Sequence, residues 1–241
     1  MYPGSRKSSA YDRVSTMFSP DGRLYQVEYA SKIVEQGTVG AAVIYDKGVL
    51  FGADKKVSSR LIKPASIEKV FKIDNHIAAI SAGLVGDARR LVQLGRKEAQ
   101  ENRMYYEEDI QVETLVKRLS GIKQLFTQYA GMRPFGVSFI IGGVDETGPR
   151  LFETEPSGAL AEYSGIAIGK GKKEAMQALE KGYSDGMPFD DAARLILDAL
   201  QKSLGEKEKL DINGLDFAFV EKGTGFQRVP RQKLKSILGK K

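Results

Sequence analysis

Residues 11–30 read Tyr-Asp-Arg-Val-Ser-Thr-Met-Phe-Ser-Pro-Asp-Gly-Arg-Leu-Tyr-Gln-Val-Glu-Tyr-Ala, and their second half predicts the start of an amphipathic helix. Ser19 is a suitable N-cap, Pro20 fits a first helical turn, and Asp21 favours the positive end of a helix. Apolar residues then recur at steps of three or four, at Leu24, Val27, Ala30, Ile33 and Val34. Periodicity alone fits an ordinary surface helix that packs on a core. The literal residue string carries more information than its periodicity does.

Composition sets the broad class of the protein. A chain of 241 residues with no linker rich in Pro, Ser or Gly predicts one domain with a sizeable core. The chain has no cysteine, which excludes disulfides, thiolate metal sites and a Cys nucleophile. It also lacks both an apolar stretch long enough to span a bilayer and a signal-peptide core at its start. We therefore expect a soluble, unexported protein of the cytoplasm, with no membrane partner and no cofactor.

The net charge of +6 raises the question of nucleic-acid binding. Residues 1–10 carry two of these charges and residues 231–241 carry five, so the rest of the chain is close to neutral. No motif of stacking aromatic residues accompanies the basic ends. Nucleic-acid binding is therefore not expected.

The order of apolar segments predicts an α+β fold. Two hairpins are predicted, at 39–45 with 49–53 and at 70–73 with 77–81, followed by helices at 86–104 and 112–129. Strands return at 137–141 and near 151–152, then helices at 175–179 and 192–199, then a strand at 215–219. Strands come in runs and helices in pairs, which argues against a parallel βαβ sheet and for stacked antiparallel sheets with helices outside.

Two polar motifs have simple structural interpretations. His76 lies in a tight polar turn and has no metal-ligand companion at a suitable spacing, so we expect an exposed turn residue and no metal site. Gly169-Lys170-Gly171-Lys172 lacks the spacing and the hydroxyl of a phosphate loop, so we expect a strand-to-helix turn.

Residues 11–30 resemble the N-terminal signature of proteasome α subunits. The match includes Tyr11, Phe18, the turn at 19–23 and the run at 26–30, in order and spacing, and a second specific match is Arg133-Pro134-Phe135-Gly136. The resemblance covers residues 11 to about 204. It implies the four-layer αββα sandwich of the N-terminal-nucleophile hydrolases, two antiparallel sheets flanked by helices. One domain at 11–230 would lie between an N-terminal tail at 1–10 and a basic C-terminal tail at 231–241.

The function that the resemblance implies is that of a non-catalytic subunit of the proteasome core particle. Family members assemble into seven-membered α rings and stack on β rings that cut protein. They pass unfolded protein substrates through an axial gate and dock regulatory ATPases. Whether the ring holds one kind of subunit or several is left open.

The resemblance assigns the gate to residues near the N-terminus. The tail at 1–10 has little to bury and is expected to be mobile. Tyr11, Asp12, Pro20 and Tyr29 match the residues that brace the open gate in the family. Pro20 would hold a rigid turn against which the tail pivots, and it equally suits an ordinary helix start.

The resemblance places an activator-binding pocket around Lys69. A lysine at this place in the family receives the C-terminal carboxylate of a regulatory ATPase whose tail ends in hydrophobic-Tyr-any residue, a charge-assisted contact. The same pocket, formed between adjacent subunits, would be walled by Gly37, Leu24, Gly83 and Leu84. The alternative is a structural ion pair of Lys69 with Asp54 or Glu68.

A loop that narrows the channel is implied at Tyr129, Ala130 and Gly131. It follows the helix predicted at 112–129 and precedes Arg133. The family pattern has a second glycine where this chain has Ala130, which leaves the shape of the constriction undefined.

A self-processing threonine hydrolase that uses Thr38 is the rival hypothesis. Catalytic relatives use an N-terminal threonine whose free amine acts as base, with an acid and a lysine nearby, and here Asp54 and Lys69 follow Thr38. Three features oppose it: the leader would contain the 11–30 helix, lysines stand at 170 and 172 where active relatives have serines, and no Asp-Ser-x-Ser-Gly-Gly segment occurs at 205–214. While Thr38 stays inside the chain its nitrogen is an amide, so no catalytic residue is assigned.

The basic segment 231–241 has two interpretations. We expect a solvated C-terminal helix, and the alternative is a site for an acidic partner.

Overall fold

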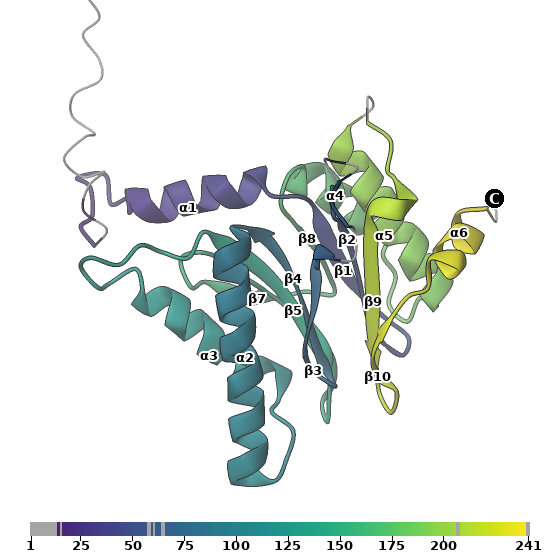
Figure 1. Ribbon diagram of the computed structural model, residues 1–241, viewed down its shortest axis with the longest axis horizontal. Helices are drawn as coiled ribbons and strands as arrows, with labels where there is room; N and C mark the ends of the chain where they lie inside the picture. Colours follow the sequence, from purple (N-terminus) through teal and green to yellow (C-terminus); the bar gives the residue numbers. More distant parts are fainter. Residues whose placement is uncertain are drawn as a thin grey trace, which may run out of the picture.

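The computed structural model describes residues 14, 16–56, 59, 61–63, 66–205 and 208–239, with the side chain of Leu238 left out. Two five-stranded antiparallel sheets lie face to face, and helices cover their outer faces (Figure 1). One sheet has the order β10-β9-β2-β1-β8, formed by β1 (Gly40–Tyr45), β2 (Gly48–Asp54), β8 (Gly165–Ile168), β9 (Leu215–Glu221) and β10 (Gly225–Arg228). The other has the order β3-β4-β5-β6-β7, formed by β3 (Val70–Asp74), β4 (Ile77–Gly83), β5 (Val137–Asp145), β6 (Gly148–Thr154) and β7 (Leu160–Glu162).

The helices form the outer layers. They are α1 (Tyr25–Gln36), α2 (Val85–Tyr106), α3 (Val112–Leu125), α4 (Lys172–Gly182), α5 (Phe189–Leu204) and α6 (Arg231–Gly239). A 3-10 turn, Ile212–Gly214, precedes β9. Helices α4 and α5 cover the first sheet, and α2 and α3 cover the second.

Three apolar clusters separate the layers. In β1, Ala41 and Val43 point toward α4 and α5, whereas Ala42 between them points toward the second sheet, as the two-residue period of a strand requires. A central cluster that includes Phe51, Ile80 and Ile140 lies between the sheets. The predicted αββα sandwich is therefore confirmed.

Helix α1 lies across one end of the sandwich, where it packs on β4 and β5 (Figure 1). Of its predicted apolar stripe only Ala30 and Val34 are buried in the single chain. The helix begins later than Ser19 and Pro20 suggested. The Ser19 hydroxyl accepts a hydrogen bond from the backbone N–H of Arg23 at 3.1 Å, so Ser19 closes a turn ahead of the helix and does not cap it.

Two other segments differ from expectation. Helix α3 ends at Leu125, and residues up to 129 form turns. The C-terminal segment is the expected helix, with its basic residues exposed, but Leu234 and Ile237 are each 1% exposed and pack with α5 and β9 residues. Helix α6 is therefore amphipathic, a property that the many basic residues of its sequence obscured. Among the described residues, every helix is too short or too polar to cross a membrane.

Candidate functional site

Three glycines meet where α1 ends. A Cβ on Gly37 would lie 2.6 Å from the backbone nitrogen of Gly83, and a Cβ on Gly83 would collide with the carbonyl oxygen of Gly136. Gly83 also has a φ of +115°, which favours glycine. The close backbone approach joins the end of α1, the end of β4 and the segment before β5. Leu84, which donates its N–H to Gly136 O at 2.8 Å, belongs to the same junction.

The side chain of Lys69 runs into the sandwich close to this junction. Its ammonium donates to the carbonyl oxygen of Ser81, two residues before Gly83, at a long distance of 3.5 Å. Burial lowers the pKa of Lys69 below its ordinary value, and the charge of Asp54 opposes this shift only in part. The Lys69 ammonium is therefore largely removed from water, and one long hydrogen bond replaces its hydration.

The alternative ion pairs of Lys69 are not formed among the described residues. Glu68 pairs with Arg228 at 2.7 Å, and an oxygen of Asp54 accepts the backbone N–H of Lys56 at 2.9 Å. No salt bridge of Lys69 occurs in the part of the chain that the structure describes. A carboxylate from outside the chain could therefore supply its missing counter-charge.

Leu24 is not brought to this junction within one chain. It precedes α1, whereas Gly37 follows it, and the twelve residues of α1 between them span about 18 Å of helix. The structure thus gathers Lys69, Gly37, Gly83 and Leu84 at one end of α1. A pocket that also contains Leu24 would have to take Leu24 from a neighbouring subunit.

The residues expected at the gate are only partly described. Tyr11, Asp12 and the tail at 1–10 lie outside the described residues. Pro20 is exposed in the turn before α1, and Tyr29 is 37% exposed on α1, with its ring stacked on Tyr25 at 6.3 Å between centroids.

The segment expected to narrow a channel is an exposed turn. Tyr129 is 53% exposed, and Gly131 has a φ of +82°, which explains a glycine there. The following segment is fixed by Asp87 in the first turn of α2. The guanidinium of Arg133 and the N–H of Gly136 both donate to the Asp87 carboxylate, so the turn projects from a rigid base.

Thr38 has none of the contacts of an activated nucleophile. Its hydroxyl oxygen is buried and has no hydrogen-bond partner within the part of the chain that the structure describes, and its nitrogen is an amide directly after Gly37. Next to it the backbone N–H of Lys170 donates to Gly37 O at 2.8 Å, while the Lys170 side chain is exposed. A hydroxyl with no base beside it remains a weak nucleophile.

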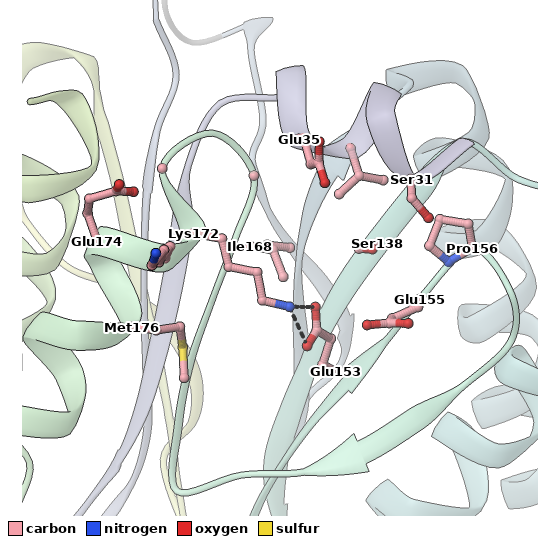
Figure 2. A pocket seen from close by; sticks show the side chains of 14 residues that line it. Ser31, Glu35, Ser138, Glu153, Glu155, Pro156, Ile168, Lys172, Glu174 and Met176 are labelled. Atoms are coloured by element: carbon pink, nitrogen blue, oxygen red, sulfur yellow. Dashed lines mark hydrogen bonds and ion pairs between the residues drawn. The ribbon is translucent and has the colours of Figure 1, made fainter. Parts of the chain in front are cut away.

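A cavity of about 590 Å³ lies beneath α1, beside the turn at residues 169–172. Ser31 and Glu35 line it from α1 (Figure 2). On its far side Lys172 donates to both carboxylate oxygens of Glu153, at 2.6 and 2.9 Å (Figure 2). The predicted strand-to-helix turn is confirmed, since the segment joins β8 to α4.

The expectation of an exposed His76 was wrong. Its side chain is 12% exposed, and Nε2 lies 2.8 Å from Ile110 O. Ligand atoms of His76, Asp74 and Asp109 lie within 4.8 Å of one another. The spacing of these residues in the sequence did not indicate this cluster. Both carboxylates already pair with Arg103, which supplies their counter-charge.

Fold and site together define a class: a sandwich of the N-terminal-nucleophile hydrolase type whose threonine lies inside the chain. Comparison with known families gives the particular one. The family model for the proteasome subunit matches residues 34–220, and the model for the N-terminal signature of the A-type proteasome subunits matches residues 11–32. The chain belongs to the proteasome subunit family and is of the α type, a non-catalytic ring subunit of the core particle.

Curated relatives agree with this assignment. The chain is 47% identical to the proteasome alpha subunit of Methanopyrus kandleri over 95% of this chain and 92% of that protein. It is 45% identical to that of Methanocaldococcus jannaschii over 96% and 88%, and 51% identical to that of Methanothermobacter thermautotrophicus over 82% and 79%. The resemblance noted from residues 11–30 is confirmed, and the self-processing hydrolase is not supported.

Proposed function

We propose that this chain forms a seven-membered α ring in the cytoplasm, stacks on β subunits, gates the passage of unfolded proteins and docks the C-terminal tails of a regulatory ATPase. The observation that carries the docking role is the state of Lys69. Its ammonium is largely buried and, among the described residues, holds one long contact, to the carbonyl oxygen of Ser81 two residues before Gly83.

The chemistry of Lys69 suits a chain-terminal carboxylate. An ammonium that is already desolvated gains a charge-assisted hydrogen bond without a further large dehydration cost. A main-chain carboxylate occurs only at the end of a polypeptide, so such a pocket reads a free C-terminus. The backbone junction of Gly37 and Gly83 leaves no side chain at those two positions to obstruct the approach.

The ring-forming role is supported by apolar surface near the start of α1. Phe18 is 64% exposed and Met17 is 50% exposed, while Leu24 and Val27 are only half-buried. Burying such area contributes about 25 cal/mol per Å². Contacts between different patches of neighbouring subunits close into a ring only if the rotation between them closes.

The stacking role is supported by a second apolar surface at the opposite end of the molecule. Met104 and Tyr105 are each 77% exposed and Tyr106 is 64% exposed, at the end of α2. Helix α2 starts beside the Gly83 junction and extends 22 residues away from it, about 33 Å (Figure 1). One end of the subunit would thus serve the activator and the other the β ring.

The test uses core particle reconstituted from this chain and its β partner. The Lys69→Ala variant is expected to assemble normally and to cleave short peptides at the basal rate, but to lose stimulation by the regulatory ATPase. Lys72→Ala is the matched control, because Lys72 is an exposed lysine three residues further along the same segment. Full stimulation of the Lys69→Ala particle would refute the docking role.

A further inference from the structure

One carboxylate, that of Asp216, holds the segment that carries Lys69. Asp216 lies in β9 and is 5% exposed. Its Oδ2 accepts the backbone N–H of Lys69 and that of Val70, each at 3.1 Å. Since β9 is an inner strand of one sheet and β3 is an edge strand of the other, Asp216 joins the two sheets next to the backbone of Lys69.

Arg228 in β10 extends this clamp to both neighbours of Lys69. It donates to Asp216 Oδ1 at 2.5 Å, to Glu68 Oε1 at 2.7 Å and to the carbonyl oxygen of Val70 at 3.1 Å. The residue before Lys69 and the residue after it are therefore both tied to Arg228. Lys69 itself is tied to Asp216 through its backbone.

The other end of the β2–β3 connection is fixed to the same place. The backbone N–H of Lys55 donates to Gly214 O at 2.8 Å, and the Lys55 ammonium lies 3.8 Å from Asp216 Oδ2. Both ends of this connection are thus anchored on residues 214–216.

The anchoring restricts where the Lys69 ammonium can lie. A lysine side chain has four rotatable bonds, so its reach is spread widely unless its backbone is held. Without the Asp216 carboxylate, two backbone N–H groups lose their acceptor, one of them on fully buried Val70. A displaced backbone would disperse the ammonium, and a ligand would then have to order it on binding.

We propose that Asp216 is a positioning residue that presents the Lys69 ammonium to a chain-terminal carboxylate. The proposal rests on the proposed function, since it gives Asp216 this task only if Lys69 binds that carboxylate. Asp216 would touch no ligand itself. Its contribution to binding would pass entirely through Lys69.

A double-mutant cycle tests this route of action. The probe is a peptide ending in Leu-Tyr-Ala, used as the free acid and as the C-terminal amide, and its affinity for the reconstituted core particle is measured. Asp216→Ala, which removes the acceptor of both N–H groups, is expected to weaken free-acid binding about 5- to 10-fold in the wild-type background and less than about 2-fold in the Lys69→Ala background. The preference for acid over amide should fall in parallel, which a general loss of stability would not produce.

Controls separate the possible failures. Asp198→Ala removes a carboxylate that pairs with Lys202 on the exposed side of α5 and should leave binding unchanged. Arg228→Gln leaves both backbone bonds of Asp216 available; it should weaken binding less than Asp216→Ala and, like it, only when Lys69 is present. Equal losses with and without Lys69 would overturn the positioning role. If Lys69→Ala itself left free-acid binding intact, the proposed docking function would fail first.

Discussion

The guanidinium of Arg133 lies 2.6 and 2.7 Å from the two carboxylate oxygens of Asp87, a bidentate pair that fastens the segment after α3 to the first turn of α2. The Gly136 N–H donates to the same carboxylate at 2.9 Å. Burial opposes ionisation of Asp87, but Arg133 and Gly136 outweigh it and hold its pKa below the usual range. The exposed turn at Tyr129 is therefore followed by a segment that Asp87 holds in place through Arg133 and Gly136.

Asp87→Asn should loosen this clasp. We expect the free energy of unfolding to fall by about 1–2 kcal/mol, a modest value because Arg133 is 60% exposed. Limited proteolysis should become faster near residues 126–132. Asp191→Asn, which breaks an exposed pair with Arg194 on α5, is the control and should change neither measurement. An Asp87→Asn protein as resistant as the wild type would show that the pair is not needed.

Lys123 predicts an unusual dependence of stability on pH. It is completely buried on α3, its ammonium donates to Thr154 O at 3.0 Å and to Thr154 Oγ1 at 2.9 Å, and burial lowers its pKa to about 7, against the charges of Glu153 and Glu155. In the unfolded chain its pKa returns to about 10.4. Between these two values the unfolded chain binds more protons, so the free energy of unfolding should rise with pH.

Lys123→Met should remove that rise. The measurement is denaturant unfolding from pH 7 to pH 10 at one assembly state, with Lys117→Met, an exposed lysine of the same helix, as control. The control should keep the wild-type profile. Parallel profiles for Lys123→Met and the wild type would contradict the assignment.

Binding of an activator tail should also depend on pH through Lys69. Because burial lowers the pKa of Lys69, its ammonium should lose its proton at lower pH than an ordinary lysine does. Affinity for a free-acid tail peptide should then fall as pH rises through that lowered pKa. In a Lys69→Arg variant the guanidinium stays charged, so any remaining affinity should be flat over the same range. A fall of equal size in both proteins would place the titrating group elsewhere.

The C-terminal helix should contribute to the stability of the fold. Leu234→Ala removes a side chain that is 1% exposed in the cluster beneath α5, and we expect a loss of about 2–3 kcal/mol in the free energy of unfolding. Lys235→Ala, on the exposed side of the same helix, should change it by less than about 0.5 kcal/mol. Thermal unfolding distinguishes the two, and equal effects would mean that α6 does not pack as described.

Thr38 should be dispensable as a hydroxyl. Because its oxygen is buried without a partner among the described residues, Thr38→Val is expected to leave the free energy of unfolding unchanged or to raise it by up to about 1 kcal/mol, with no loss of peptide cleavage by the reconstituted particle. Thr154→Val, which removes an acceptor of Lys123, should cost about 1–3 kcal/mol. Loss of activity in Thr38→Val would revive the hydrolase hypothesis.

Local patterns predicted most of the sandwich. The β1–β2 hairpin could be predicted because apolar runs flank Asp46-Lys47-Gly48. Helices α2 and α5 could be predicted because apolar residues recur along them at helical spacing. β7 was missed because Leu160–Glu162 is an exposed edge strand with no buried alternation. The prediction that Ser19 caps the helix was wrong, because its hydroxyl accepts a hydrogen bond within the turn that precedes α1.

The candidate site was less accessible to sequence reasoning. The resemblance identified Lys69 as a binding residue. Whether Lys69 can bind a partner depends on whether Asp54 and Glu68 form ion pairs with it, which the sequence does not show. Asp216 lies 147 residues from Lys69, and nothing in its local sequence signals the contact. His76 likewise lies close to Asp109 because the loop after α2 returns to the β3–β4 turn. Contacts between residues this far apart in the sequence are determined by tertiary packing.

The most direct test of the docking claim is an electron cryomicroscopy map of the reconstituted core particle with the Leu-Tyr-Ala peptide bound. We predict peptide density between adjacent α subunits, with its terminal carboxylate about 3 Å from the Lys69 ammonium. A well-resolved peptide whose carboxylate contacts another cation, with Lys69 still directed at Ser81 alone, would contradict the account.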